Sequence, residues 1–294
     1  MTLATQFPRR RTANQLRSSL DAMYAGSCMG TVSSIQSAVI QVVGIRAPIG
    51  ACCEVLGRNQ NSLARVVGHH NDALLVCPVQ GTTGIMAGDR VQLRSNRFLV
   101  PVGDEYLGRV VDCSGNPVDY EHSIAWEKKL DLASSAPTSI SRAPISEILE
   151  TGVKAIDAFA TLGRGQRIGL FAGAGVGKSQ LMGMIARGTN ADVVVIALVG
   201  ERGREVSEFL DNELTPELRN KCVTVVATSD QSPMQRVQAA QAATAISEYF
   251  RSRGKDVLLL MDSVTRFATA QRELGLSVGE VPTTRGLPPS VFSE

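Results

Sequence analysis

The stretch that decides the fold is Ala172–Ser179, which reads Ala-Gly-Ala-Gly-Val-Gly-Lys-Ser. It closes an apolar run of strand length, Arg167–Ala172, and leads into a helical pattern that begins at Lys178. A glycine-rich turn between a strand and a helix is the setting of a phosphate-binding loop. Glycines let backbone N–H groups turn toward the phosphates, and the helix N-terminus adds a positive dipole.

Each position of this loop has an expected role. Lys178 is expected to reach the β- and γ-phosphates, and the Ser179 hydroxyl to bind Mg²⁺. The predicted phosphate-contacting residues are Gly173, Ala174, Gly175, Val176, Gly177, Lys178, Ser179 and Gln180. Ala172 stands where the usual pattern has its first glycine, and such a small residue still permits the turn. A chance glycine-rich turn that ends in Lys-Ser remains the alternative for the loop taken alone.

A strand-end acid supplies the second chemical element. Asp262 directly follows the apolar run Val257–Met261. Because the carboxyl ends of parallel strands gather at one edge of a sheet, Asp262 is expected near the loop. A carboxylate in that place positions Mg²⁺ in phosphoryl-transfer ATPases. Acids at strand ends are common, so the metal role depends on the pairing with the loop.

Charged residues follow a third apolar strand, at Val199–Glu205. Hydrolysis needs a carboxylate that orients and deprotonates water, together with cations that stabilise charge on the γ-phosphate. Glu201 is the best-placed base, and Arg202 could contact phosphate oxygens. A solvated helix start is the alternative interpretation of these charges.

The region from 146 to 294 alternates apolar strands with helical stretches, which predicts an α/β fold with a parallel sheet covered on both faces. The expected strands are Arg167–Ala172, Asp192–Val199, Cys222–Ala227 and Val257–Met261, and the expected helices begin at Lys178, Arg204, Pro233 and Thr265. The region from 28 to 102 instead shows short β runs separated by turn residues, which predicts a small closed barrel. A junction and linker is expected at 103–145.

A basic tail precedes the barrel, at residues 1–27, with four arginines and no acid before Asp21. A solvated tail is the simplest interpretation, and a contact with a membrane surface or a partner is the alternative. The whole chain carries 30 Lys+Arg against 28 Asp+Glu, so composition gives no support to a nucleic-acid-binding surface. Its apolar runs are far shorter than the ~20 residues of a membrane span. The six cysteines have no zinc or disulfide spacing and are expected to be buried thiols in a reducing cytoplasm, with the three histidines on the surface.

Three stretches together resemble the flagellar and type III secretion export ATPases, relatives of the catalytic subunit of rotary ATP synthases. They are Ala172–Ser179, Gly200–Val206 and Met261–Ala268. Similar stretches also occur at Val102–Asp112, Gly152–Asp157 and Pro288–Phe292, and the similarity runs from about Gly30 to the last residue. The resemblance implies an N-terminal β-barrel, a RecA-like P-loop domain and a C-terminal helical domain, in a homohexameric ring.

The resemblance also implies a function and its residues. The family couples ATP hydrolysis to releasing chaperones from export substrates and to unfolding those substrates, in the cytoplasm at the inner face of the cell membrane. The implied cofactors are ATP and Mg²⁺, and the implied partners include export chaperones and stalk or regulator proteins. By position, Lys178 and Ser179 hold phosphate and Mg²⁺, Glu201 is the catalytic base, and Arg202 contacts the γ-phosphate. Glu205 and Asp262 order the water shell of the metal, and Arg266 lies close to the site.

The chain ends directly after Pro288–Phe292, where family members continue. The resemblance therefore predicts an incomplete ATPase domain without its last strands, its arginine finger and the C-terminal domain. An arginine finger contributes about 10³–10⁵ in rate, so we expect a chain that binds Mg-ATP and hydrolyses it poorly.

Two other functions stay open. The chain could be a non-catalytic assembly or regulatory module of the same apparatus, or a RecA-like nucleic-acid motor. A nucleic-acid motor needs aromatic contacts to bases, and Phe98 is the only Phe, Trp or Tyr between residues 28 and 102. We therefore expect no nucleic-acid partner. The shared motifs do not separate flagellar from virulence-type secretion.

Overall fold

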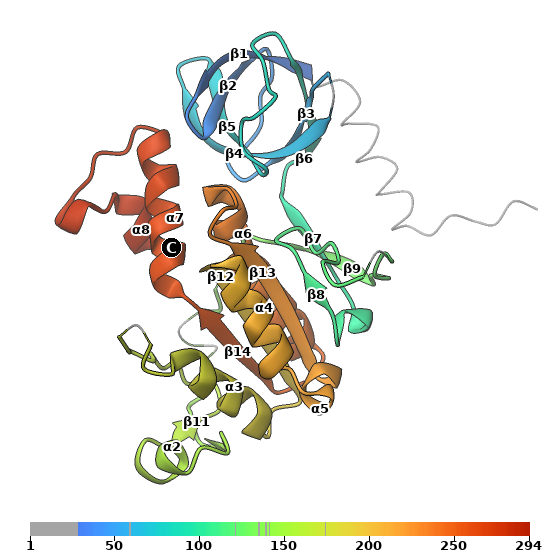
Figure 1. Cartoon of the computed structure of the whole chain (residues 1–294). Helices are drawn as coiled ribbons and strands as arrows, with labels where there is room; N and C mark the ends of the chain where they lie inside the picture. Colours follow the sequence, from blue (N-terminus) through green and yellow to red (C-terminus); the bar gives the residue numbers. More distant parts are fainter. Residues whose placement is uncertain are drawn as a thin grey trace, which may run out of the picture. The chain divides into compact units, whose positions relative to one another are not determined.

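The structure, a computed structural model, divides into two compact units (Figure 1). It describes residues 29–294 apart from Asn59, Glu121, Ser135, Ser139, Ser141 and Ala174. The first unit ends at Pro78 and resumes at Thr82–Asn96, and the second contains Val79–Gly81 and Arg97–Glu294. The basic tail at 1–27 and Cys28 lie outside the described residues.

The first unit is a closed antiparallel barrel with the strand order β1-β2-β5-β4-β3-β6. Its strands are β1 (Met29–Gln36), β2 (Val39–Val43), β3 (Cys52–Leu56), β4 (Asn61–His70), β5 (Ala73–Pro78) and β6 (Arg90–Ser95). Every second side chain along a strand points inward, so Cys53, Val55 and Val91 are buried. The predicted barrel is confirmed, and its closure leaves no strand edge free.

Turn residues set the boundaries of these strands. The sequence from 31 to 45 forms two strands, β1 and β2, because the chain reverses after Ser37, whose φ is 51°. Asn71 adopts a φ of 53° in the turn between β4 and β5. Asparagine tolerates this left-handed conformation better than most residues do, so the Asn71-Asp72 pair suits the turn of this hairpin.

The strand that follows the barrel belongs to the second unit. We expected Phe98–Val102 within the barrel region, but β7 (Leu99–Val102) pairs with β9 (Lys128–Asp131) from the linker region. The barrel is already closed by the pairing of β6 with β1 and β3, so it has no free edge for β7. The junction also supplies β8 (Val110–Val111), which pairs in parallel with β13 (Cys222–Thr228).

The centre of the second unit is a parallel sheet with the order β14-β12-β13-β8. Its central strand β12 (Val193–Glu201) is buried at every position, and β14 (Val257–Asp262) lies at one side. The helices are α2 (Lys154–Phe159), α3 (Lys178–Gly188), α4 (Gly203–Asn212), α5 (Pro216–Asn220), α6 (Pro233–Ser252), α7 (Val264–Ser277) and α8 (Pro289–Ser293), with 3₁₀ turns η2 (Asp104–Tyr106) and η4 (Thr284–Gly286). Two short strands, β10 (Ile148–Leu149) and β11 (Leu162–Gly163), precede and follow α2 in the sequence and pair with each other.

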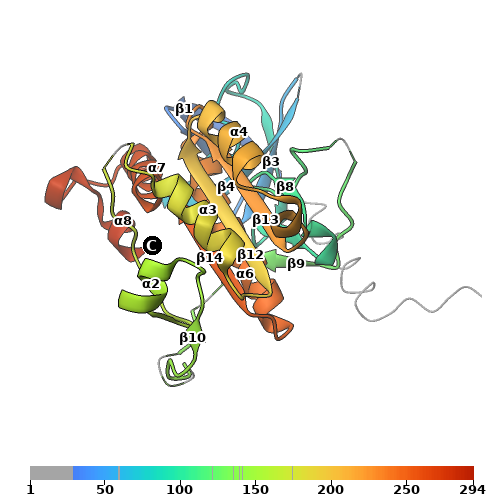
Figure 2. The same cartoon turned by 60° about the horizontal axis from the view of Figure 1, so that its bottom comes forward.

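Helices cover both faces of this sheet, as predicted for unbroken apolar strands. Val194, Ile196 and Leu198 of β12 share a core with residues of α3, α4 and α5, so these helices lie on one face. The alternate residues of β12 point to the opposite face, where α6 packs on β12, β13 and β14 (Figure 2). The long helix α6 begins with a capping box between Ser232 and Gln235.

One predicted strand does not form. Arg167–Ala172 is irregular, although its composition suits a strand. A strand is stabilised by hydrogen bonds to a neighbour, and residues 167–172 pair with none of the strands that the structure describes. Without that pairing, Phe171 is 97% exposed and Ile168 is also exposed.

Candidate functional site

The glycine-rich loop ends where α3 begins, at Lys178. Gly175 and Gly177 have φ values of 76° and 93°, a left-handed conformation that glycine adopts without steric cost. Backbone N–H groups from 175 to 180 donate to no other described residue, and the loop is exposed to solvent. These donors at the start of an 11-residue helix are free to bind an anion.

Lys178 forms an ion pair with Asp262. Its ammonium group donates a hydrogen bond to Oδ1 of the carboxylate, although 84 residues separate the two in sequence. Asp262 ends β14 and is only 3% exposed, whereas the side chain of Lys178 is 30% exposed. The structure therefore brings together the loop lysine and the strand-end acid that the sequence paired.

A bulge at the end of β12 presents Glu201. Val199 and Glu201 pair with consecutive residues of β13, so Gly200 between them is an extra residue in the strand. Its φ is 72°, and a Cβ atom at this position would lie 2.9 Å from Cβ of Arg266. Glycine is thus required here both by the backbone conformation and by the close approach of a side chain. Glu201, the next residue, is 9% exposed.

Arg266 holds the end of β12 from the first turn of α7. Its guanidinium donates one hydrogen bond to the carbonyl oxygen of Gly200, and Nη2 lies 3.2 Å from Oε2 of Glu201. Ser263 caps α7 by accepting a hydrogen bond from the backbone N–H of Arg266. The family resemblance implied that Arg266 lies near the site. Its contact with Gly200 could not be predicted from the sequence, because the contact depends on the bulge.

Glu201 and Glu205 form a hydrogen-bonded pair of carboxyl groups. Burial, followed by this hydrogen bond and the negative charge of Asp262, raises the pKa of Glu201 to about 7. The hydrogen bond with Glu201, followed by the positive charges of Arg202 and Arg266, lowers the pKa of Glu205. The two shifts have opposite signs because the proton resides on Glu201 and the negative charge on the more exposed Glu205. A buried carboxyl group that titrates near neutrality suits proton transfer.

The remaining predicted residues lie at the rim of this cluster. Arg202 is exposed and contacts Glu205 at 3.4 Å. Ser179 and Gln180 are exposed on the first turn of α3, and no side-chain contact joins them to another described residue. Gly173 and Val176 are exposed as well, and Ala174 lies outside the described residues.

The residues at the site fit a divalent cation of the magnesium type. The Asp262 and Glu205 carboxylates and the Ser179 hydroxyl are hard oxygen donors, which Mg²⁺ prefers over nitrogen or sulfur. Within the described ranges, no three His, Cys, Asp or Glu side chains cluster as a protein-only metal cage. Proteins commonly hold Mg²⁺ through one or two carboxylates together with the phosphates of a substrate.

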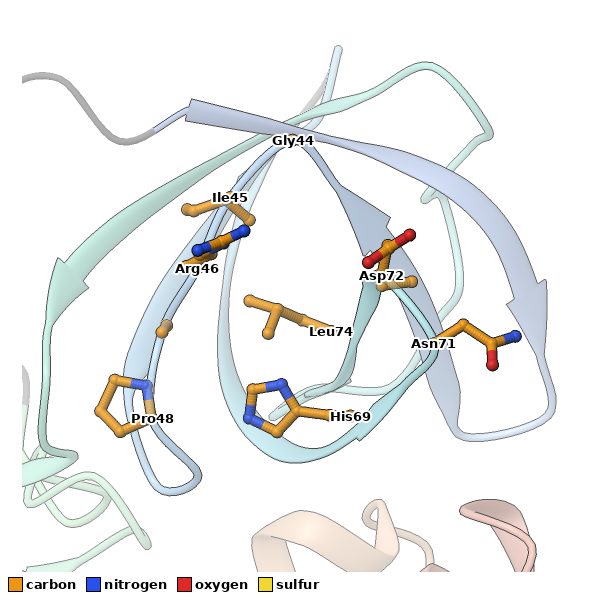
Figure 3. A pocket seen from close by; sticks show the side chains of 10 residues that line it. Gly44, Ile45, Arg46, Pro48, His69, Asn71, Asp72 and Leu74 are labelled. Atoms are coloured by element: carbon orange, nitrogen blue, oxygen red, sulfur yellow. The ribbon is translucent and has the colours of Figure 1, made fainter.

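The barrel has a hollow of about 920 Å³ at one end (Figure 3). Its floor includes Leu74, and the polar side chains around it, including Arg46, His69 and Asp72, are exposed. It holds none of the predicted site residues and no buried polar group. We therefore assign the chemistry to the sheet edge of the second unit.

Other sequence expectations concern residues away from the site. Four cysteines are buried as expected, and burial raises the pKa of each thiol to about 12: Cys53, Cys77, Cys113 and Cys222. Cys52 is only half-buried, which differs from the expectation, and Cys28 lies outside the described residues. His69, His70 and His122 are exposed, as expected. Phe98 is only 3% exposed, so its ring is not available to stack on a base. Among the helices that the structure describes, none is both long and apolar enough to cross a bilayer.

Comparison with known proteins identifies relatives of this chain. Residues 152–294 match the ATP synthase alpha/beta family, nucleotide-binding domain. The chain is 46% identical over 281 residues to the type 3 secretion system ATPase of Xanthomonas euvesicatoria, covering 95% of this chain and 64% of that relative. It is 45% identical to the flagellum-specific ATP synthase of Bacillus subtilis, over 90% of this chain and 61% of the relative.

Solved structures show the same similarity. The assembled ATPase EscN of the type III secretion system of enteropathogenic E. coli superimposes with a TM-score of 0.84 at 42% identity, covering 90% of this chain and 64% of that one. EscN in complex with its central stalk EscO gives a TM-score of 0.83 at 43% identity, with 90% and 65% covered. The chain thus spans less than two thirds of the length of these relatives.

Proposed function

Because the chain is a homologue of the type III secretion and flagellar ATPases, with the ATP synthase alpha/beta nucleotide-binding domain at 152–294, we propose that it binds ATP with Mg²⁺ and hydrolyses it for a protein export apparatus. The observation that carries the proposal is the Lys178–Asp262 contact, which brings the glycine-rich loop to a buried strand-end acid. Both elements are those that a phosphate and its metal require.

The loop and the start of α3 bind the phosphates in this proposal. The free N–H groups from 175 to 180 donate to the anion, with Gly173 and Ala174 as further phosphate-contacting residues proposed from the sequence, and Lys178 contacts the terminal phosphates. Ser179 and Asp262 hold the metal, and Glu205 holds it through water. Bound Mg²⁺ neutralises charge on the phosphates.

Glu201 acts as the general base toward the attacking water. Its carboxyl group is buried and titrates near neutrality, so it can accept a proton at physiological pH. Arg266 orients this carboxyl group through the 3.2 Å contact. Arg202 is exposed and free to leave Glu205 for the γ-phosphate, where a cation stabilises the developing charge.

The partners we propose follow the relatives. EscN is described as assembled and in complex with its central stalk, which supports a homo-oligomer and a stalk or regulator partner for this chain. The hexameric ring that we propose comes from the resemblance to the export ATPases. Export chaperones and their substrates are further proposed partners, with no nucleic acid. The location we propose is cytoplasmic, peripheral at the inner face of the cell membrane, with the basic tail at 1–27 as the membrane contact. The domain order we propose is this tail, a barrel domain, a linker and the ATPase domain.

Nucleotide binding by the whole chain tests the proposal. A fluorescent ATP analogue with Mg²⁺ should bind the wild type, and Lys178→Ala should weaken it about 10- to 150-fold, the equivalent of the 1.5–3 kcal/mol of a hydrogen bond to a charged group. Lys255→Ala is the matched control, because Lys255 is exposed at the other end of β14. Equal binding by the two variants, or none by the wild type, would reject the site.

A further inference from the structure

Three cations near the proposed phosphate site each contact a carboxylate. Lys178 pairs with Asp262, Arg266 with Glu201, and Arg202 with Glu205. The groups that would attract phosphate and the groups that would attract a metal therefore neutralise one another. A ligand that takes one member of a pair leaves the other member without its partner.

The three pairs differ in how strongly this matters. Arg202 and Glu205 have exposed side chains, at 78% and 46%, so water can solvate both when they separate. The Asp262 side chain is 4% exposed, and water cannot replace its partner. Removing one partner of a buried pair leaves an uncompensated charge, which is strongly unfavourable.

We infer that the Lys178–Asp262 ion pair makes nucleotide binding and divalent-cation binding depend on each other at this site. Phosphate draws Lys178 away more easily once a cation takes its place at Asp262, and the cation binds Asp262 more easily once Lys178 has another anion to contact. Nucleotide without metal, and metal without nucleotide, both work against the ion pair. The inference rests on the proposed function, since it concerns the same nucleotide site.

Removing the acid separates this mechanism from the ordinary attraction between metal and phosphate. Asp262→Asn frees Lys178, so ATP in the presence of EDTA should bind about tenfold more tightly than to the wild type, within the 5–150-fold range usual for coupled sites. Glu205→Gln removes a carboxylate from the same site without freeing Lys178, and should change metal-free binding by less. In a Lys178→Met background, Asp262→Asn should produce no gain.

A measurement on the wild type keeps the test independent of how the variants fold. Acetic anhydride modifies free amines, and peptide mass spectrometry reports the rate at each lysine. Mg²⁺ alone should increase the modification of Lys178 at least about twofold by competing for Asp262, whereas Lys255, an exposed lysine, should not respond. NaCl at matched ionic strength controls for screening.

The outcomes distinguish failure of the proposed coupling from failure of the proposed nucleotide binding. If the wild type binds Mg-ATP but Asp262→Asn gains no more metal-free affinity than Glu205→Gln, the coupling is overturned and nucleotide binding stands. An unchanged Lys178 rate in Mg²⁺ also overturns the coupling. If no form binds ATP under any condition, the proposed function fails, and the coupling with it.

Discussion

The barrel and the parallel sheet of this chain both bury apolar side chains, but they differ in which side chains meet at the ends of their strands. In the barrel, each strand pairs on both sides, and adjacent strands run in opposite directions, so strand ends of both kinds meet at each mouth. In the second unit, parallel β12 and β14 both end at the same edge. Glu201 and Asp262 therefore come together, although 61 positions separate them.

The difference is also visible in the charged groups. The buried residues of the barrel core are apolar, whereas the sheet unit buries Glu201 and Asp262. Burying a carboxyl group is unfavourable unless it is paired and hydrogen-bonded, so each of these acids has a basic partner. The described core of the barrel is therefore apolar, while the sheet has buried carboxyl groups at an edge that can bind a ligand.

The largest effect should come from the buried acid that this edge presents. Glu201→Gln keeps the size of the side chain and removes the base, so we expect ATP hydrolysis to fall about 10²- to 10⁴-fold. Binding of Mg-ATP should stay within a few-fold of the wild type. His69→Gln, in the hollow of the barrel, is the matched control and should leave both quantities unchanged. Phosphate release and nucleotide binding on the same samples measure the two effects, and an equal loss in both variants would erase the distinction between the regions.

Core truncation should affect the two units separately. Ile40 and Ile196 are both fully buried, the first in the barrel and the second in β12. Replacing either by Ala should cost about 2–5 kcal/mol, because it removes buried methyl groups and leaves a cavity. Hydrogen exchange followed by mass spectrometry should show faster exchange in the barrel for Ile40→Ala and in the sheet for Ile196→Ala. Uniform loss of protection over both units would mean that they unfold together.

Most of this architecture follows from local patterns. The strands and helices after Lys178 were predicted because continuous runs of Val, Ile and Leu alternate with helical periods. The barrel followed from short runs between turn residues, such as the Asn71-Asp72 pair. Arg167–Ala172 has the composition of a strand and is not one, because a strand depends on a neighbour and composition does not report neighbours.

The residues of the site were predictable from the sequence, but most of the hydrogen bonds that connect them were not. Parallel strands bring Lys178 and Asp262 to one edge by topology, so their contact was expected. The proton shared by Glu201 and Glu205 and the hydrogen bond from Arg266 to Gly200 depend on a one-residue bulge. A bulge changes the direction of each following side chain, and no periodic pattern records it.

A methyl group at the bulge should have an intermediate effect. Gly200→Ala places a non-glycine residue in a left-handed conformation and pushes its Cβ against Arg266, so we expect a loss of about 1–3 kcal/mol. Gly50 in the barrel also has a positive φ, of 89°, but a Cβ there would meet nothing within 4 Å. Gly50→Ala should therefore cost less and leave ATP hydrolysis unchanged, while Gly200→Ala should slow hydrolysis by displacing Arg266. Urea unfolding and phosphate release test both, and equal costs would show that steric contact at the bulge is unimportant.

The smallest effect concerns pH and belongs to the sheet edge alone. Glu201 has a pKa of about 7 in the folded chain against an ordinary value of 4.5, so the folded state holds a proton that the unfolded state releases between these values. Its contribution to stability is complete below pH 4.5 and is lost as pH rises through about 7. Glu205, whose pKa is lowered, acts in the opposite direction and loses its contribution as pH falls. Hydrolysis needs ionised Glu201, so the rate at pH 6 should be about one fifth of that at pH 7. Glu201→Gln should remove the fall in stability between pH 5 and pH 7, measured by urea unfolding. The same slope in both proteins would show that Glu201 is not the titrating group.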